Sequence, residues 1–331
     1  MNTLGKILRV SVFGESHGKG VGVVIDGCPP GLSLNTEMLT ENIERRRSGK
    51  KGTTARKEDD TPEIVSGIYK GLSTGAPIMI MTHNADKRSS DYSELAATPR
   101  PGHADMVMKN KYHGYADARG GGHLSGRLTW AMVVAGAIAR LIIRPAEVRA
   151  GIVSVGGNTD VQAEIDEVVK QGDSVGGLIE CVAKNVPAGL GEPLYYSLES
   201  AISQAIFAIP AIKGIEFGSG FRAAGMRASE HNDPVISSDG RTSTNNAGGV
   251  NGGISNGNDI IIRVAVKPPS SISKEQLTWN LEKNEMDILK IHGRHDACIA
   301  LRIPVIIEAA VALALADLTL LNRAIYGGLD Q

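Results

Sequence analysis

Apolar and polar positions alternate along this chain in blocks that predict both strands and helices. Four short runs, rich in β-branched residues and bounded by Gly or Pro, predict strands over residues 21–25, 78–81, 177–182 and 260–266. Two longer apolar patterns, over residues 125–143 and 303–324, predict helices that are mostly buried. The mixture indicates an α+β chain.

Helix starts are predicted from capping residues. Thr36 is expected to cap a helix that extends to Arg47. Thr159 with Gln162, and Ser273 with Gln276, match the spacing of a capping box, in which two side chains satisfy the free amides of the first turn. Two further helices are therefore expected after Thr159 and Ser273.

A weak repeat links the two halves of the chain. Pro-Pro-Gly-Leu at residues 29–32 and Pro-Ala-Gly-Leu at residues 187–190 each follow a predicted strand and precede a helical pattern. An internal duplication is one interpretation, and coincidence is the other, because turns favour Pro and Gly for local reasons. No low-complexity linker separates the halves, so we expect a single domain over residues 1–331.

Composition narrows the class of protein. The chain has 331 residues and a formal net charge of -1, which excludes a generally polycationic nucleic-acid binder. Hydrophobic residues make up 42% and charged residues 21%, the mixture of a folded globular protein. Its 40 glycines are about 12% of the chain, against the usual ~7%. The excess of glycine therefore needs an explanation.

The expected location is the cytoplasm. Cys28, Cys181 and Cys298 are odd in number and widely spaced, which argues against a disulfide framework or a zinc ribbon. No signal peptide is evident at the N-terminus, and charged residues interrupt both of the most apolar segments. We expect no membrane association.

The candidate catalytic and binding residues lie in loops where histidine, arginine and glycine occur together. Four segments show this grouping: Gly-Glu-Ser-His-Gly at 14–18, three arginines at 45–47 followed by further cations to residue 57, Arg-Pro-Gly-His-Ala-Asp at 100–105, and Gly-Gly-Gly-His-Leu-Ser-Gly-Arg at 120–127. The first lies between two predicted strands, and the last leads into a helix N-terminus, where free amides bind anions. Histidine can transfer protons near neutral pH.

Common nucleotide and hydrolase motifs are not matched. Residues 18–23 lack the last glycine of the dinucleotide fingerprint, and residues 48–51 lack the Ser or Thr of a P-loop. No metal-ligand spacing and no Gly-x-Ser-x-Gly elbow occurs in the sequence. The residues alone thus indicate an enzyme that handles phosphorylated, multiply anionic ligands with histidines as acids or bases.

These motifs, taken in order, resemble the chorismate synthase family along nearly the whole chain. The segments that carry the resemblance are 14–18 with 26–29, 45–47, 100–105, 125–129, 187–192, 267–271, and 294–296 with 308–309. The resemblance implies a layered β-α-β sandwich and, typically, a homotetramer. It also implies conversion of 5-enolpyruvylshikimate 3-phosphate to chorismate by 1,4-anti elimination of phosphate, with reduced FMN as cofactor and NADPH involved only indirectly, in reducing the flavin.

Roles for individual residues also follow from the resemblance. His103 would be the acid beside the leaving phosphate, His17 would lie near the flavin, and Asp296 would assist removal of the substrate proton through the flavin. The implied substrate-binding residues are Ser16, Arg47, Arg100, Ser125, Arg127 and Arg294. The implied cofactor-binding residues are Arg46, His123, Leu124, Ser125, Pro210, Ala211, Gly252, Lys267, Pro268, Pro269, Ser270, Ser271 and Arg294.

The sequence departs from the family pattern at a few positions. His123 stands where Arg is common, Gly126 and Leu128 replace Ala and Glu, and Lys51 lies near a usual Arg in a loop one residue shorter. Two other functions stay open at this point. One is a flavin-dependent oxidoreductase, and the other is an RNA-binding module that uses residues 45–57, against which the scarcity of aromatic residues argues.

Overall fold

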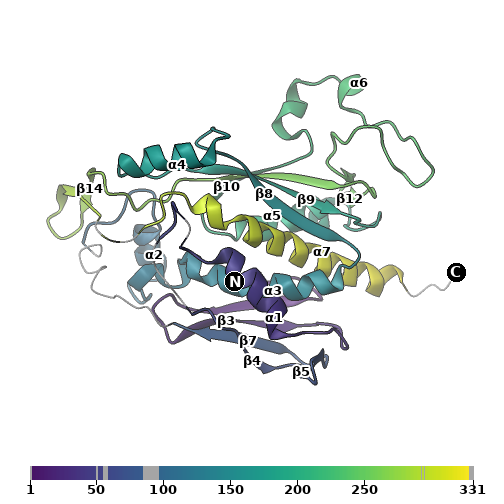
Figure 1. The fold of residues 1–331 in the computed structure, drawn as a ribbon, viewed down its shortest axis with the longest axis horizontal. Coiled ribbons are helices and arrows are strands. Elements are labelled where there is room, and N and C mark those ends of the chain that lie inside the picture. Colours follow the sequence, from purple (N-terminus) through teal and green to yellow (C-terminus); the bar gives the residue numbers. More distant parts are fainter. Residues whose placement is uncertain are drawn as a thin grey trace.

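Two antiparallel sheets enclose a layer of helices in the computed structural model of the chain (Figure 1). The structure describes residues 2–49, 51–54, 59–84, 97–291, 293 and 295–327. The first sheet has the order β1-β2-β3-β7-β4 and the second β10-β13-β9-β8. Their strands are β1 (Thr3–Leu4), β2 (Arg9–Gly14), β3 (Gly20–Asp26), β4 (Glu63–Ser66), β7 (Ile78–His83), β8 (Glu147–Val155), β9 (Gly177–Lys184), β10 (Ile212–Phe217) and β13 (Ile260–Val266).

Smaller elements occupy the connections. The two-stranded pairs are β5 (Ile68–Tyr69) with β6 (Leu72–Ser73), β11 (Val250–Asn251) with β12 (Ile254–Ser255), and β14 (Gln276–Asn280) with β15 (Glu285–Leu289). The α-helices are α1 (Thr36–Arg46), α2 (Asp105–Lys111), α3 (Thr129–Ile142), α4 (Val161–Lys170), α5 (Leu198–Phe207), α6 (Ala228–His231) and α7 (Pro304–Tyr326). The 3₁₀ segments are η3 (Arg119–Leu124), η4 (Gly126–Leu128), η5 (Leu194–Tyr196), η6 (Gly220–Gly225) and η7 (Ile299–Arg302). All four predicted strands and both predicted long helices are present.

The two halves of the chain share one topology. In chain order the main strands are β2, β3, β4, β7 in the first half and β8, β9, β10, β13 in the second, and each sheet arranges its four in the order first, second, fourth, third. A helix of the central layer, α1 or α5, joins the second strand to the third in both halves. The two similar turns at 29–32 and 187–190 lie at equivalent points before these helices. This equivalence supports the predicted internal duplication.

The long helices α3 and α7 form the centre of the core. Helix α3 packs on β2, β3 and β7, whereas α7 packs on β8 and β9, and the two helices pack on each other. They approach closely at Gly136, where an added Cβ would lie 2.3 Å from the Cβ of Ala309. Two helical stretches, Arg119–Ile142, which ends in α3, and Pro304–Tyr326, which is α7, are long and apolar enough to cross a membrane, but 72% and 78% of their apolar windows are buried in the protein. Burial between two sheets accounts for their apolar character.

A buried carboxylate ties this helix layer together. Glu308 of α7 is only 1% exposed and accepts hydrogen bonds from Arg45 of α1 at 2.6 and 2.8 Å, from Arg140 of α3, and from the backbone amide of Ala150 at 2.9 Å. Burial alone would raise the pKa of Glu308, but the hydrogen bond from Arg45 and the nearby charges lower it. Arg45 is therefore paired with a buried carboxylate, although its own side chain is 38% exposed.

The predicted helix starts need correction. The side chain of Asn35, not Thr36, caps α1 by accepting the amide of Met38, and Asp160, not Thr159, caps α4. Asn and Asp are as good N-caps as Thr, so the local pattern leaves the choice open by one residue. The helix expected after Ser273 is wrong, because residues 276–280 form strand β14. The three cysteines are free and buried, in agreement with the absence of a disulfide framework.

The connections that matter for function meet at one end of the sandwich. Segment 15–19 joins β2 to β3, and 47–62 and 208–211 each link a central helix to the third strand of a half. Segments 84–128 and 267–303 link the fourth strand of each half to α3 and α7, and they carry α2 and the β14–β15 hairpin. Figure 1 shows α2 and β14 at the same end, opposite α6 and the end of α7.

Candidate active site

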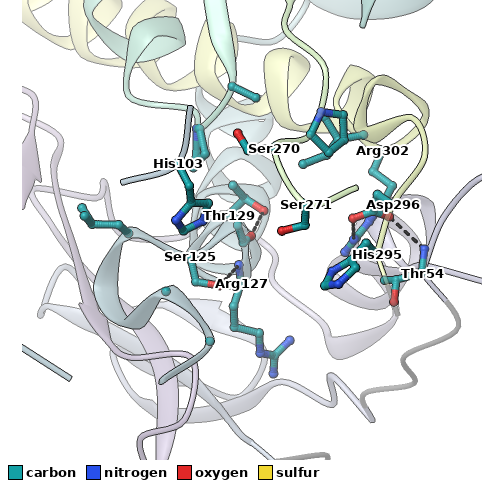
Figure 2. Close-up of a pocket in the computed structure, with 18 of the residues that line it drawn as sticks. Thr54, His103, Ser125, Arg127, Thr129, Ser270, Ser271, His295, Asp296 and Arg302 are labelled. Atoms are coloured by element: carbon teal, nitrogen blue, oxygen red, sulfur yellow. Dashed lines mark hydrogen bonds and ion pairs between the residues drawn. The ribbon is translucent and has the colours of Figure 1, made fainter. Parts of the chain in front are cut away.

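A cavity of about 760 Å³ opens between these connections. Figure 2 shows His103 and Ser125 on one side of it, and His295, Asp296 and Thr54 on the other, with Ser271 between them. Among the described residues, its wall holds the cations Arg46, Arg47, Arg100, Arg127, Lys267 and Arg302, the carboxylates Asp60 and Asp296, and the histidines His17, His103 and His295. The excess of cations suits an anionic ligand.

A second part of the wall is apolar. It is formed by Leu124, Pro210, Ala211, Pro269, Ile291, Ile299, Ile303 and Ile306. No Phe, Tyr or Trp is among the described residues that line the cavity. One region therefore suits charged groups and the other a flat, largely apolar group, which is the pattern of a pocket for a ligand or cofactor.

His103 lies in a compact turn that fixes its ring. Its Nδ1 lies 2.6 Å from Oδ1 of Asp105 and 3.0 Å from Nη2 of Arg100. Asp105 also accepts from the backbone amide, Nε and Nη2 of Arg100, at 2.7 to 3.1 Å. Burial would raise the pKa of the Asp105 carboxyl, but the bonds from Arg100 and His103 hold it well below its usual range.

This arrangement decides which ring nitrogen of His103 can serve a ligand. A guanidinium only donates and a carboxylate only accepts, so Nδ1 can satisfy only one of its two neighbours. The shorter contact is with Asp105, which favours a proton on Nδ1 that is donated to that carboxylate. Nε2 is then the nitrogen left for a ligand.

The second half of the chain contacts this turn directly. Nζ of Lys267 donates to the carbonyl oxygen of Gly102 at 2.6 Å, and Ser270 Oγ donates to the same oxygen at 2.8 Å. Arg100 Nη1 donates to Ser271 Oγ at 3.0 Å. Burial, together with the charge of Lys213, lowers the pKa of Lys267, so an anion beside it would be favourable.

Three successive glycines shape the wall beside His103 and Ser125. Gly120, Gly121 and Gly122 all have positive φ, at 60°, 81° and 53°, a conformation that residues with a side chain rarely adopt. A Cβ on Gly120 would lie 2.3 Å from Nδ1 of His17, so only glycine allows this approach. The carbonyl oxygen of Gly122 accepts from the amide of Ser16 at 3.1 Å, which fixes the turn that carries His17.

Ser125 caps the short helix that follows. Its side chain accepts the amide of Arg127 at 3.3 Å. Thr129 Oγ1 accepts from Arg46 Nε at 2.9 Å and donates to the carbonyl oxygen of Gly126 at 2.6 Å. The start of α3 is thereby joined to the end of α1 at the floor of the cavity.

Asp296 lies on the side contributed by the second half. Its Oδ1 accepts the amide of Thr54 at 2.9 Å, and its Oδ2 lies 3.4 Å from Nη1 of Arg302 (Figure 2). Nε of Arg302 donates to the carbonyl oxygen of Arg46 at 3.0 Å. These contacts orient the carboxylate against the loop after α1.

Most of the expected site residues are brought together. The following line the cavity: His17, Arg46, Arg47, Arg100, His103, Leu124, Ser125, Arg127, Pro210, Ala211, Lys267, Pro269, Ser270, Ser271 and Asp296. Ser16, His123, Pro268 and Gly252 are not among the lining residues. Arg294 lies outside the described residues.

His123 and Gly252 have other surroundings. The His123 ring contacts the carbonyl oxygen of Gly14 at 2.8 Å and Asn2 Oδ1 at 3.1 Å, so it joins the 120–124 segment to the N-terminal strands. Gly252 lies in the turn between β11 and β12, and Figure 1 shows β12 toward the end of the sandwich opposite β14. A cofactor role for either residue remains a prediction.

Several residues that form the site were not predicted from the sequence. They are Asp60, Asn84, Asp105, Thr129 and Arg302. Asp105 stands in the Arg-Pro-Gly-His-Ala-Asp segment, and its place two residues after His103 was a usable signal. The others are isolated in sequence and meet their partners only in the folded protein.

Comparison with known proteins gives a consistent result. The family model for chorismate synthase matches residues 8–320. The chain is 53% identical over 324 residues to chorismate synthase of Chitinophaga pinensis, covering 98% of both chains. It is 46% identical to that of Archaeoglobus fulgidus, covering 98% of this chain and 99% of that one. A chorismate synthase crystal structure superposes with a TM-score of 0.74 at 28% identity, covering 97% and 94% of the two chains. The chain belongs to the chorismate synthase family.

Proposed function

We propose that this protein is a phosphate-eliminating lyase that converts 5-enolpyruvylshikimate 3-phosphate to chorismate. Family membership supports the reaction. The cation-rich wall of the cavity is the observation that supports this cavity as the active site. The substrate carries a phosphate and carboxylates, and the bidentate donors of arginine match both groups. We further propose a single-domain, cytoplasmic protein that assembles as a homotetramer.

The residues present fit a reduced FMN. The apolar wall suits a flat ring, Gly121 and Gly126 leave space that side chains would reduce, and Lys267 with Ser270 and Ser271 offers donors for a phosphate. Leu124, Ser125, Pro210, Ala211 and Pro269 would complete the site. When bound, a reduced flavin supplies electron density to a carbon that no side chain here could activate, and it recovers that density. NADPH would act only in reducing the flavin elsewhere.

The chain's own residues would manage charge and protons. His103, held by Asp105 through Nδ1, carries a proton on Nε2 and gives it to the departing phosphate. Arg127, Arg100 and Arg47 bind the anionic groups and stabilise the charge that develops on the phosphate oxygens. Asp296, oriented by Thr54 and Arg302, would assist removal of the substrate proton. His17 completes the wall beside the glycines.

Anaerobic phosphate release tests this proposal. Purified protein should release phosphate from 5-enolpyruvylshikimate 3-phosphate only with reduced FMN, and His103→Ala should lower the rate about 100-fold or more. The matched control is His231→Ala on α6, at the far end of the sandwich, which should retain the wild-type rate. Equal turnover without flavin would contradict the proposal, and one reductant consumed per turnover would instead indicate an oxidoreductase.

RNA binding through residues 45–57 is not supported by the contacts. Arg45 pairs with Glu308, Arg46 with Asp60, Arg47 with Glu44, and Lys51 with Asp166. Lys50, Arg56 and Lys57 lie outside the described residues. A salt titration of RNA binding should detect no more than weak, nonspecific association.

A further inference from the structure

A buried group of three charged side chains lies at the floor of the cavity. Asp60 is 2% exposed, Arg46 3% and Arg127 7%. Arg46 Nη1 lies 3.3 Å from Asp60 Oδ2, and Arg127 Nη1 donates to Asp60 Oδ1. The two guanidinium groups share the one carboxylate, so Asp60 helps to fix the positions of both.

The donors of Arg127 show where that anion would bind. Nε donates to Asn84 Oδ1 at 3.0 Å, and Nη1 donates to Asp60. Nη2 is buried and has no hydrogen-bond partner among the residues that the structure describes. A buried donor without a partner is unfavourable, and a charged one is more so. Since Arg127 also lines the cavity, Nη2 is the donor that remains for a ligand.

The backbone of Asp60 is held in an unusual conformation. Its φ is +57°, in the left-handed region, which Asp and Asn tolerate better than most residues. Trp130 Nε1 donates to the carbonyl oxygen of Asp60 at 3.1 Å from the core side. Such a conformation persists where the surroundings determine it, and it fixes the position of the carboxylate.

The same arrangement is joined to the turn that carries His17. Asn84 Nδ2 donates to the carbonyl oxygens of Glu15 at 2.9 Å and Gly18 at 3.1 Å, while Asn84 Oδ1 accepts from Arg127. The orientation of the Arg127 guanidinium is therefore set by one partner before the strand β4 and another after β7.

We propose that Asp60 is a positioning residue for phosphate elimination: it holds the Arg127 guanidinium so that Nη2 faces an anionic group of the substrate. Asp60 itself does not contact the reacting atoms and acts through Arg127. The expected effect of Asp60 on catalysis rests on the proposed function. The expected effect on anion binding rests only on the contacts described above.

A double-mutant cycle tests the catalytic consequence. Asp60→Asn keeps the shape and the tolerance for positive φ but removes the charge, and we expect kcat/KM for phosphate release to fall about 10- to 100-fold. In an Arg127→Lys background, Asp60→Asn should lower kcat/KM by no more than about 3-fold, because the guanidinium group that Asp60 positions is already absent. If the two substitutions lower kcat/KM independently, so that the two fold-losses multiply in the double variant, Asp60 only supports folding and the proposal is overturned.

Asp317→Asn is the matched control. Asp317 is also a buried carboxylate, 7% exposed, and it accepts the backbone amides of Lys6, Ile7 and Leu8 far from the cavity. It should lower the melting temperature and leave kcat/KM unchanged. A comparable fall in kcat/KM would mean that loss of stability alone explains the Asp60 effect.

Binding of inorganic phosphate separates this inference from the proposed function. Calorimetric titration should give a Kd at least about 5-fold weaker in Asp60→Asn than in wild type, and no such difference between the two in the Arg127→Lys background. Wild-type affinity in Asp60→Asn overturns the positioning role, whether or not the enzyme turns over. If wild type lacks turnover but this pattern holds, the function fails and the positioning role stands. If Asp60→Asn does not fold, the same titration with Asn84→Ala, which removes the Nε partner, decides.

Discussion

The two halves of this protein share a scaffold but contribute differently to the cavity. The first half supplies Arg46, Arg47, Asp60, Arg100, His103 and Arg127, a dense set of charges that bind one another. The second half supplies Pro210, Ala211, Pro269, Ser270 and Ser271 and the isoleucines of 291–306, with Lys267, Asp296 and Arg302 as its charges. A repeated topology thus provides two sets of connections at one end, of which one became mainly polar and the other mainly apolar.

The halves also differ in how their connections are fixed. The turn at 100–105 is bound internally, by the bonds of Asp105 to Arg100 and His103. The segment at 267–271 is bound to its own half, through the carbonyl oxygen of Ala211 and Ser174 Oγ, and also to the first half, through Gly102 and Arg100. The turn at 100–105 thus carries its own side-chain bonds, whereas the segment at 267–271 is held from both halves.

The largest expected effect breaks the contact between the halves. Glu308→Gln leaves Arg45 and Arg140 in the helix layer without their carboxylate, and loss of one partner of a buried pair costs about 3–5 kcal/mol. Urea denaturation of the variant and of the wild type gives the difference in the free energy of unfolding. Lys274→Gln, which removes an exposed pair with Asp173, is the control and should change stability by less than about 1 kcal/mol.

A smaller effect is expected where the halves touch most closely. Gly136→Ala places a Cβ 2.3 Å from that of Ala309 and 2.5 Å from its Cα, so α3 and α7 must move apart. Overpacking of this kind costs about 1–3 kcal/mol. Gly151→Ala in β8, where no atom lies within 4 Å of the new Cβ, should be close to neutral. Equal melting temperatures for the two variants would show that the helix contact is not tight.

The smallest effect concerns the internal bonding of the first half and depends on pH. Because the pKa of Asp105 is depressed in the folded protein, its contribution is present above its unfolded pKa of about 3.9 and is lost as pH falls below it. Asp105→Asn should therefore lower stability by roughly 1–2 kcal/mol at pH 7 and by less at pH 3. Urea denaturation at the two pH values measures the difference, and a constant deficit would contradict the ionic explanation.

The periodicity of apolar residues predicted the main strands and long helices well, because burial of their apolar side chains determines where these elements form. Strand β13 spans the predicted residues, and α7 exceeds its prediction by two residues at its C-terminal end. The error at Ser273 has a clear reason. Leu277 and Trp279 alternate with polar residues and pair across the hairpin with Ile288 and Met286, a period-two pattern that outweighs the capping signal.

The site was harder to predict because its contacts are made between distant segments. The arginine triplet suggested one cationic surface, yet Arg45 pairs with Glu308 of α7, Arg46 lies at the cavity floor and Arg47 lies beside Glu44. Successive helix residues point in different directions, so adjacency in sequence does not give a shared role. Asp60 and Asn84 carry no motif, and their importance depends on Arg127, more than 40 residues away in both cases.

The three glycines at 120–122 have a thermodynamic consequence. Glycine loses more conformational entropy on folding than any other residue, so a loop of three in left-handed conformations is costly to order. This conformational entropy is lost when the chain folds, so ordering the loop does not weaken the binding of a ligand. A protein that must bind an anionic substrate thus exchanges part of its folding stability for a binding wall that is already in place.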